Sequence, residues 1–149
     1  MTTSAPILPA ACLPAPLPDP PTSSLRVIIV DDQPIEREVM RRLLTREPDI
    51  EIAGIFADGR QAVEAIPKLK PDLVFLDVEM PELDGFGVVE AVASGMPAFV
   101  FVTANEEFAR RAFDVHALDY LVKPCKGERL RLALDRAREA VAIRRARNS

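Results

Sequence analysis

The feature that most constrains the fold is a regular alternation of two hydrophobic patterns from Leu25 onward. Short apolar runs typical of buried strands are followed by stretches with apolar residues at helical spacing. The predicted strands are 25–30, 50–56, 72–77, 98–103 and 118–122, and the predicted helices are 34–46, 59–69, 84–94, 106–114 and 127–146. Alternation repeated five times with short turns predicts an α/β protein, a three-layer sandwich around a parallel sheet.

Two local signals support these helix positions. Pro34 suits the first turn of a helix, where its missing N–H has no partner to lose. Asp58, directly before Gly59, is of the residue type that caps a helix N-terminus. With 149 residues there is room for one domain of ordinary size, which we place at 25–146.

The two ends of the chain differ from this domain. Residues 1–24 hold seven of the fourteen prolines and a single charged side chain, Asp19. They predict a disordered, proline-rich tail, and the lack of Lys or Arg before Arg26 argues against a secretory signal. Residues 147–149 are interpreted as a short C-terminal tail or the start of a linker. The basic residues Arg144, Arg145 and Arg147 are expected to form a solvated helix end.

Composition excludes several classes of protein. The net charge of −4 does not favour binding of polyanions by the domain as a whole. No apolar run approaches the roughly 20 residues of a membrane helix, so no membrane contact is expected. Cys12 and Cys125 fall short of a disulfide framework or a zinc-ligand pattern, and a cytoplasmic protein is expected. The single histidine, His116, is interpreted as a surface or interface residue, and Cys125 as a packing residue.

Polar residues stand at the ends of four predicted strands. Asp31-Asp32 follows the first strand, Asp77 ends the third, Thr103 ends the fourth and Lys123-Pro124 follows the fifth. Because the carboxyl ends of parallel strands meet at one edge of a sheet, we expect these side chains to lie together. Three carboxylates, a hydroxyl and an ammonium at one place predict a site for Mg²⁺ and a phosphoryl group.

The residue types suit particular roles. Asp77 is the candidate nucleophile, since a carboxylate can accept a phosphoryl group as an acyl phosphate. Lys123 would neutralise charge on that group and Thr103 would donate its hydroxyl to it. Each residue also has a plainer interpretation: Asp31-Asp32 as a helix cap, Thr103 as an ordinary β-branched strand residue, and Lys123 as a solvated loop charge.

Taken in order, these motifs resemble the receiver domain of bacterial response regulators. They are Asp31-Asp32, the strand ending in Asp77, Met80-Pro81 with Asp84-Gly85, Thr103-Ala104 and Lys123-Pro124. The resemblance implies a flavodoxin-like fold with strand order 2-1-3-4-5. It also implies that Asp77 is the phosphoacceptor, that Asp32, Asp77 and the Glu79 carbonyl bind Mg²⁺ with help from Asp31, and that Thr103 and Tyr120 act as switch residues. Tyr120 is equally well explained as a half-buried strand aromatic.

The same resemblance implies a function and partners. A sensor histidine kinase would phosphorylate Asp77, and the surface of the fourth helix, fifth strand and fifth helix would then change. The resemblance also implies a homodimer through this surface. The stretches Phe101–Ala104 and Ala112–Pro124 are similar to receivers of LytTR-class transcription regulators, which carry a DNA-binding domain after the receiver. The chain is therefore expected to be either a receiver-only regulator or a piece of a longer protein whose DNA-binding domain lies outside it. Beyond magnesium-dependent self-phosphorylation and dephosphorylation, no enzyme activity is expected.

Two other classes stay open at this point. A haloacid-dehalogenase-type phosphatase also uses a strand-end Asp, Mg²⁺ and a Lys. It usually carries Asp-x-Asp on the nucleophile strand, whereas Asp77 is followed by Val78-Glu79. A metal-free receiver used only for binding is the second alternative, and the complete acidic set argues against it.

Overall fold

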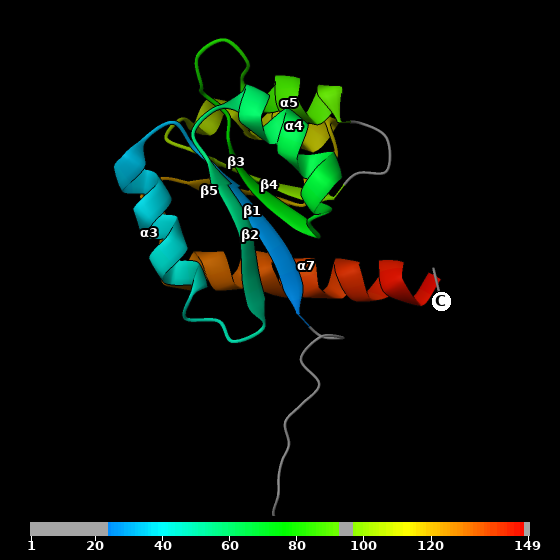
Figure 1. Cartoon of the computed structure of the whole chain (residues 1–149). Helices are drawn as coiled ribbons and strands as arrows, with labels where there is room; N and C mark the ends of the chain where they lie inside the picture. Colours follow the sequence, from blue (N-terminus) through cyan, green and yellow to red (C-terminus); the bar gives the residue numbers. More distant parts are fainter. Residues whose placement is uncertain (1–23, 93–96, 148–149) are drawn as a thin grey trace, which may run out of the picture.

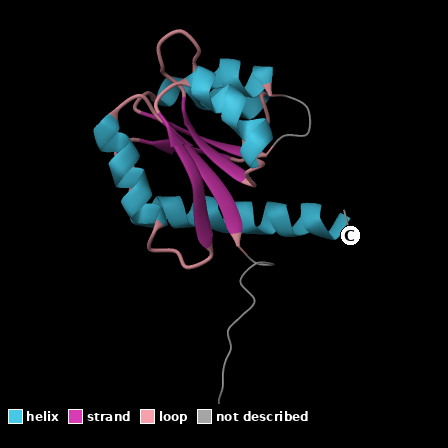
Figure 2. Ribbon diagram, viewed as in Figure 1, coloured by secondary structure: helices cyan, strands magenta, loops and turns pink. Residues whose placement is uncertain are grey.

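The sheet has the predicted parallel architecture. In the computed structural model, which describes residues 24–92 and 97–147, five parallel strands lie in the order β2-β1-β3-β4-β5. The strands are β1 (Leu25–Val30), β2 (Ile50–Phe56), β3 (Leu73–Asp77), β4 (Ala98–Thr103) and β5 (Asp119–Val122). Figure 2 shows the twisted sheet between two layers of helices. This arrangement confirms the flavodoxin-like, three-layer fold with strand order 2-1-3-4-5.

The helices divide between the two faces of the sheet (Figure 1). They are α3 (Pro34–Leu44), α4 (Gly59–Leu69), α5 (Gly85–Ala91), α6 (Ala109–Asp114) and α7 (Gly127–Arg147), with a 3₁₀ turn η2 (Glu106–Phe108) before α6. α3 and α7 pack on one face and α4, α5 and α6 on the other. Each helix before α7 connects two parallel strands, and such connections are almost always right-handed. Because the strand order reverses direction at β1, right-handed connections place helices on both faces of the sheet.

Each face of the sheet has its own hydrophobic core. Val27, Ile29 and Phe75 point to the α3–α7 side, where they meet Leu134 and other α7 residues. Their neighbours in the strands point to the other side and form the second cluster with α4, α5 and α6. Because successive strand residues alternate between faces, the central strands are apolar throughout. β3 is buried at every position.

The local signals in the sequence are confirmed where the structure describes them. Pro34 is the first residue of α3, and the Asp58 carboxylate accepts a hydrogen bond from the N–H of Gln61 at 2.9 Å. The N-cap of α3 is Gln33, without a side-chain cap bond, so helix capping does not explain Asp31-Asp32.

Several predicted boundaries were wrong by a few residues. α3 ends at Leu44, where Thr45 caps the helix, and the predicted 106–114 helix is a 3₁₀ turn followed by a short α-helix. β3 and β5 begin one residue later than predicted, and α7 extends to Arg147. α5 begins at Gly85, because Asp84 is its N-cap, and it ends at Ala91, where Val92 is the C-cap.

The ends of the chain bring one correction. Residues 1–23 and 148–149, which include most of the predicted tails, lie outside the described residues. The expectation of a fully solvated basic helix end was wrong for Arg144 and Arg145, because both guanidinium groups bind the Asp72 carboxylate. Among the helices that the structure describes, none has the length and apolar character needed to cross a membrane.

Candidate functional site

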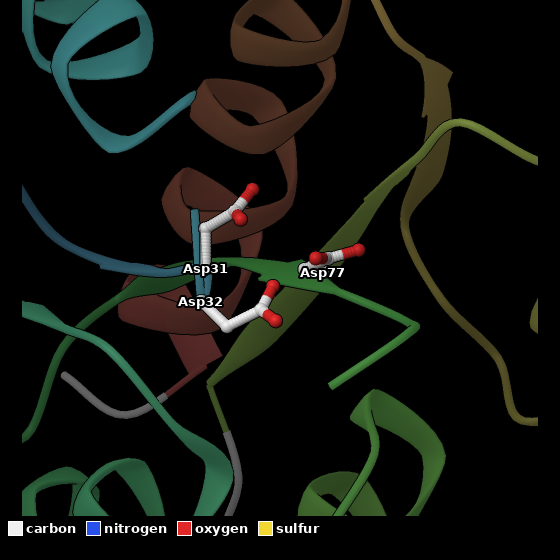
Figure 3. A group of neighbouring side chains, drawn as sticks. All are labelled: Asp31, Asp32 and Asp77. Carbon is white, nitrogen blue, oxygen red and sulfur yellow. The ribbon is translucent and has the colours of Figure 1, made fainter. Parts of the chain in front are cut away.

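Three carboxylates converge at the carboxyl edge of the sheet. Val30 of β1 pairs with Leu76 of β3, so Asp31 and Asp77 follow neighbouring strand positions. One carboxylate oxygen from each of Asp31, Asp32 and Asp77 lies within 4.8 Å of the others. Figure 3 shows the three side chains gathered where the two strands end. The structure therefore brings together the acidic residues that the sequence placed in one site.

Lys123 lies against this acidic group. Its Nζ is 2.8 Å from Asp31 Oδ2 and 3.5 Å from Asp77 Oδ2, and its side chain is only 9% exposed. The interpretation of Lys123 as a solvated loop charge is therefore wrong. β5 places it there because Thr103 pairs with Val122 in the sheet, and the Lys123 N–H donates to the Thr103 carbonyl at 2.8 Å.

Burial and neighbouring charges shift the pKa values of Asp77 and Lys123. Burial, followed by the charge of Asp31, raises the pKa of Asp77 from 3.8 to about 7, although Lys123 acts in the opposite direction. For Lys123, burial acts to lower the pKa, but the hydrogen bond to Asp31 and the charge of Asp77 outweigh it and raise the pKa. One ammonium therefore compensates two buried carboxylates incompletely, and further positive charge would stabilise the site.

The donor atoms fit a hard divalent cation. Asp32 Oδ1 is buried and has no hydrogen-bond partner among the described residues. A buried carboxylate oxygen without a partner is costly unless a cation or water binds it. Since Mg²⁺ binds through one or two carboxylates and keeps several waters, the acidic cluster suits it. Asp32 is the member whose free oxygen is best explained by such an ion.

The turn after β3 has a tight backbone contact. The Gly85 N–H donates to the Val78 carbonyl at 2.9 Å. A Cβ at Gly85 would lie 2.5 Å from the Asp77 carbonyl oxygen, so only glycine allows this approach. The Glu79 N–H donates to Asp77 Oδ1 at 3.3 Å, while the Glu79 side chain is exposed. This turn holds the Asp77 carboxylate in position.

Thr103 and Tyr120 are linked through a residue that the sequence reasoning missed. The Thr103 hydroxyl is fully buried and accepts a hydrogen bond from the Asn105 N–H at 3.2 Å. The Tyr120 hydroxyl donates to the Asn105 carbonyl oxygen. The Asn105 side chain caps the η2 turn by accepting from the Glu107 N–H at 3.0 Å. An Asn before Glu106-Glu107 is a helix-start signal that could have identified it.

Comparison with known protein families gives a clear match. The profile described as the response regulator receiver domain matches residues 27–135. This chain belongs to that family. The haloacid-dehalogenase alternative is accordingly not needed. Receiver domains bind Mg²⁺ at an acidic pocket, and this receiver has a cluster of three Asp side chains.

Curated relatives of the receiver are response regulators. The transcriptional regulatory protein BtsR of Salmonella typhi is 44% identical over 116 residues, which cover 77% of this chain and 48% of that protein. An uncharacterized response regulatory protein of Yersinia pestis is 46% identical over 113 residues, covering 75% of this chain and 48% of that protein. The chain thus spans about half the length of the curated relatives it matches.

Solved structures show the same fold. The REC domain of AraT, a response regulator from Geobacillus stearothermophilus, is 28% identical with a TM-score of 0.74, covering 81% of this chain and 98% of that chain. The response regulatory domain of protein mrkE from Klebsiella pneumoniae is 32% identical with a TM-score of 0.72, covering 78% of this chain and 97% of that chain.

Proposed function

We propose that this receiver, spanning residues 25–146, accepts a phosphoryl group on Asp77 in the presence of Mg²⁺ and acts as a phosphorylation-dependent switch of a two-component system. The observation that carries the proposal is the cluster of three carboxylates at the strand ends, two of which pair with Lys123 while one buried oxygen of Asp32 has no partner among the described residues. Such a group is poorly compensated on its own, and a divalent cation together with a phosphoryl group complements its charges.

Each side chain has a role in the transfer. An Asp77 carboxylate oxygen attacks phosphorus, forming an O–P bond while the bond from phosphorus to the donor's leaving group breaks. Lys123 Nζ, already 3.5 Å from Asp77 Oδ2, lies where it can neutralise the negative charge of the transferred group. Asp32, Asp77 and the Glu79 carbonyl would hold Mg²⁺, with Asp31 assisting. When bound, this ion supplies electrostatic stabilisation of the phosphoryl oxygens.

Thr103 and Tyr120 are proposed as the switch. If the Thr103 hydroxyl turns to a phosphoryl oxygen, it gives up its present bond with the Asn105 N–H. Release of Asn105 would in turn weaken the bond from the Tyr120 hydroxyl to the Asn105 carbonyl. Loss of both contacts lets the β4–α6 connection move, which is a population shift driven by a local charge change.

The direct experiment is intact mass spectrometry after incubation with acetyl phosphate, with Mg²⁺ or with EDTA. We expect a magnesium-dependent gain of one phosphoryl group in the wild type, and no gain in Asp77→Asn. Asp114→Asn, which changes an exposed carboxylate, is the matched control and should gain the group normally. A gain that persists in Asp77→Asn would refute the assignment of the acceptor, and no gain in the wild type would refute small-molecule phosphorylation.

The proposed partners follow from the family and the relatives. A sensor histidine kinase is the proposed phosphodonor, and the chain is proposed to act in the cytoplasm. The resemblance of residues 112–124 to LytTR-class receivers, together with relatives named as transcriptional regulatory proteins, supports an output in transcription through a separate DNA-binding domain.

A homodimer through α6, β5 and α7 is also proposed. Phe113 is 80% exposed on α6, beside a groove of about 180 Å³ that Tyr120 and Arg136 help to line. Asp119 pairs with Arg129 and Arg136 of the same chain, so it is not a free contact residue. Phe113→Ser should therefore weaken a phosphorylation-dependent dimer in analytical ultracentrifugation, and an unchanged dimer would exclude this surface.

A further inference from the structure

We propose that Asp72 is an ionic clamp that fixes the last two turns of α7 to the edge of the sheet opposite the acidic site. The clamp would set the position and direction in which the chain leaves the receiver after Arg147. It concerns a region that the phosphorylation chemistry does not use. It would stand even if Asp77 were not phosphorylated.

The need for a clamp follows from the length of α7. The helix has 21 residues and spans about 32 Å at 1.5 Å per residue. Its last buried apolar residue is Val141, whereas Ile143 is 51% exposed. Among the described residues of α7, no apolar side chain after Val141 is buried in the core. A helix end without tertiary packing frays, so polar contacts must hold this part if it stays helical.

Asp72 supplies those contacts. Its Oδ1 accepts a hydrogen bond from the Arg144 guanidinium at 2.7 Å, and its Oδ2 accepts from the Arg145 guanidinium at 3.0 Å. The Asp72 residue is 8% exposed, although each arginine side chain is about two-fifths exposed. Hydrogen bonds to a charged, sheltered acceptor are stronger than bonds between neutral groups.

The carboxylate is itself fixed by the sheet. Asp72 stands directly before β3, and its Oδ2 also accepts from the Arg26 N–H of β1 at 2.9 Å. The Asp72 N–H donates to the Arg26 carbonyl at 2.7 Å, and the Asp72 carbonyl accepts from the Ala98 N–H of β4 at 3.1 Å. One residue thus joins three strands to α7, which makes it a rigid anchor for the helix.

Both ends of the described domain meet at this anchor. The Arg145 guanidinium also donates to the Ser24 carbonyl at 2.9 Å, at the residue before β1. At its other end, α7 binds β5 through Arg129, which contacts the Asp119 carboxylate and the Tyr120 carbonyl. α7 is therefore held to the sheet both beside the proposed switch residue and at the clamp. A helix held at both ends keeps one position relative to the sheet.

Hydrogen exchange measured by mass spectrometry tests the clamp on the 149-residue chain. We expect backbone amides of residues 142–147 to be protected in the wild type and to exchange about tenfold faster in the Arg144→Gln/Arg145→Gln variant. Exchange in residues 130–137 should be unchanged. Arg131→Gln is the matched control, because Arg131 lies on the same helix, is 65% exposed and pairs with Glu47 at 3.8 Å.

Asp72→Asn is the second variant. Asn keeps an oxygen acceptor for the Arg26 N–H but removes the charge that holds the two arginines, so the same segment should lose protection. The melting temperature and far-ultraviolet circular dichroism identify a variant that unfolds as a whole. Residues 142–147 that exchange freely in the wild type would overturn the clamp, as would equal protection in a folded Arg144→Gln/Arg145→Gln variant.

Discussion

The raised pKa of Asp77 gives a stability prediction that needs no phosphodonor. In the metal-free fold this pKa lies at about 7, against 3.8 for the ordinary group, chiefly because the carboxyl is buried and Asp31 is close. Ionising Asp77 in the folded chain therefore costs at most about 4 kcal/mol relative to the unfolded chain. The perturbation is Asp77→Asn, which keeps the shape of the side chain and removes its charge.

The sign follows from proton binding. The folded chain holds the Asp77 proton at a pH at which the unfolded chain has lost it, so folding is favoured by this group at low pH. Its contribution to the free energy of unfolding is fully present below pH 3.8 and is lost as the pH rises to about 7. Asp77→Asn should therefore exceed the wild type in stability by up to about 4 kcal/mol near pH 8, and by less than half of that near pH 5.

Urea unfolding in EDTA, followed by circular dichroism at both pH values, measures this difference. The comparison between variant and wild type cancels titrating groups that are distant from Asp77, and Asp114→Asn, an exposed carboxylate, controls for loss of charge alone. Mg²⁺ should raise the wild-type stability more than that of Asp77→Asn. A variant that is less stable than the wild type, or a stability difference independent of pH, would refute the reasoning.

Three further changes test the packing around the site. Lys123→Gln should lower the free energy of unfolding by about 3 kcal/mol, since it leaves buried carboxylates without their cation, and added Mg²⁺ should recover part of that loss in urea melts. Gly85→Ala should cost about 2 kcal/mol in the same assay because its Cβ would lie 2.5 Å from a backbone oxygen. Gly127→Ala, whose Cβ would meet only the Leu43 side chain at an ordinary 3.9 Å, should be neutral, and equal effects would contradict the close approach. Leu134→Ala should lower stability by about 3 kcal/mol, whereas Leu132→Ala, 54% exposed, should change it by less than about 0.5 kcal/mol, as thermal melts can check.

Much of the fold was predictable because its signals are local. The apolar runs at 25–30, 50–56 and 98–103 coincide with β1, β2 and β4, and Asp58 caps α4 as expected. Helix boundaries were less predictable in short polar segments, where few apolar residues mark the helical spacing. At residues 106–114, capping by Asn105 gives a 3₁₀ turn before α6, and periodicity alone does not separate the two helix types.

The candidate site was predictable for a different reason. Asp31, Asp77, Thr103 and Lys123 lie at or just beyond strand ends, and a parallel sheet brings all such ends to one edge. Asn105 was missed because its link to Thr103 and Tyr120 runs through its backbone N–H and carbonyl. Every residue except proline carries the same backbone N–H and carbonyl, so contacts of this kind cannot be predicted from residue type.

The sequence by itself determined the three-layer fold of this protein and the residues of its candidate site. Both depend on local patterns, namely the hydrophobic period and the polar residues at strand ends. Only the tertiary structure decided which charges are compensated. It buried Lys123 between Asp31 and Asp77, left Asp32 Oδ1 without a partner, and drew Arg144 and Arg145 onto Asp72. The pairing of Lys123 with Asp77 spans 46 positions, and that of Arg144 with Asp72 spans 72. Charge compensation depends on distance and burial in space, which no local pattern specifies.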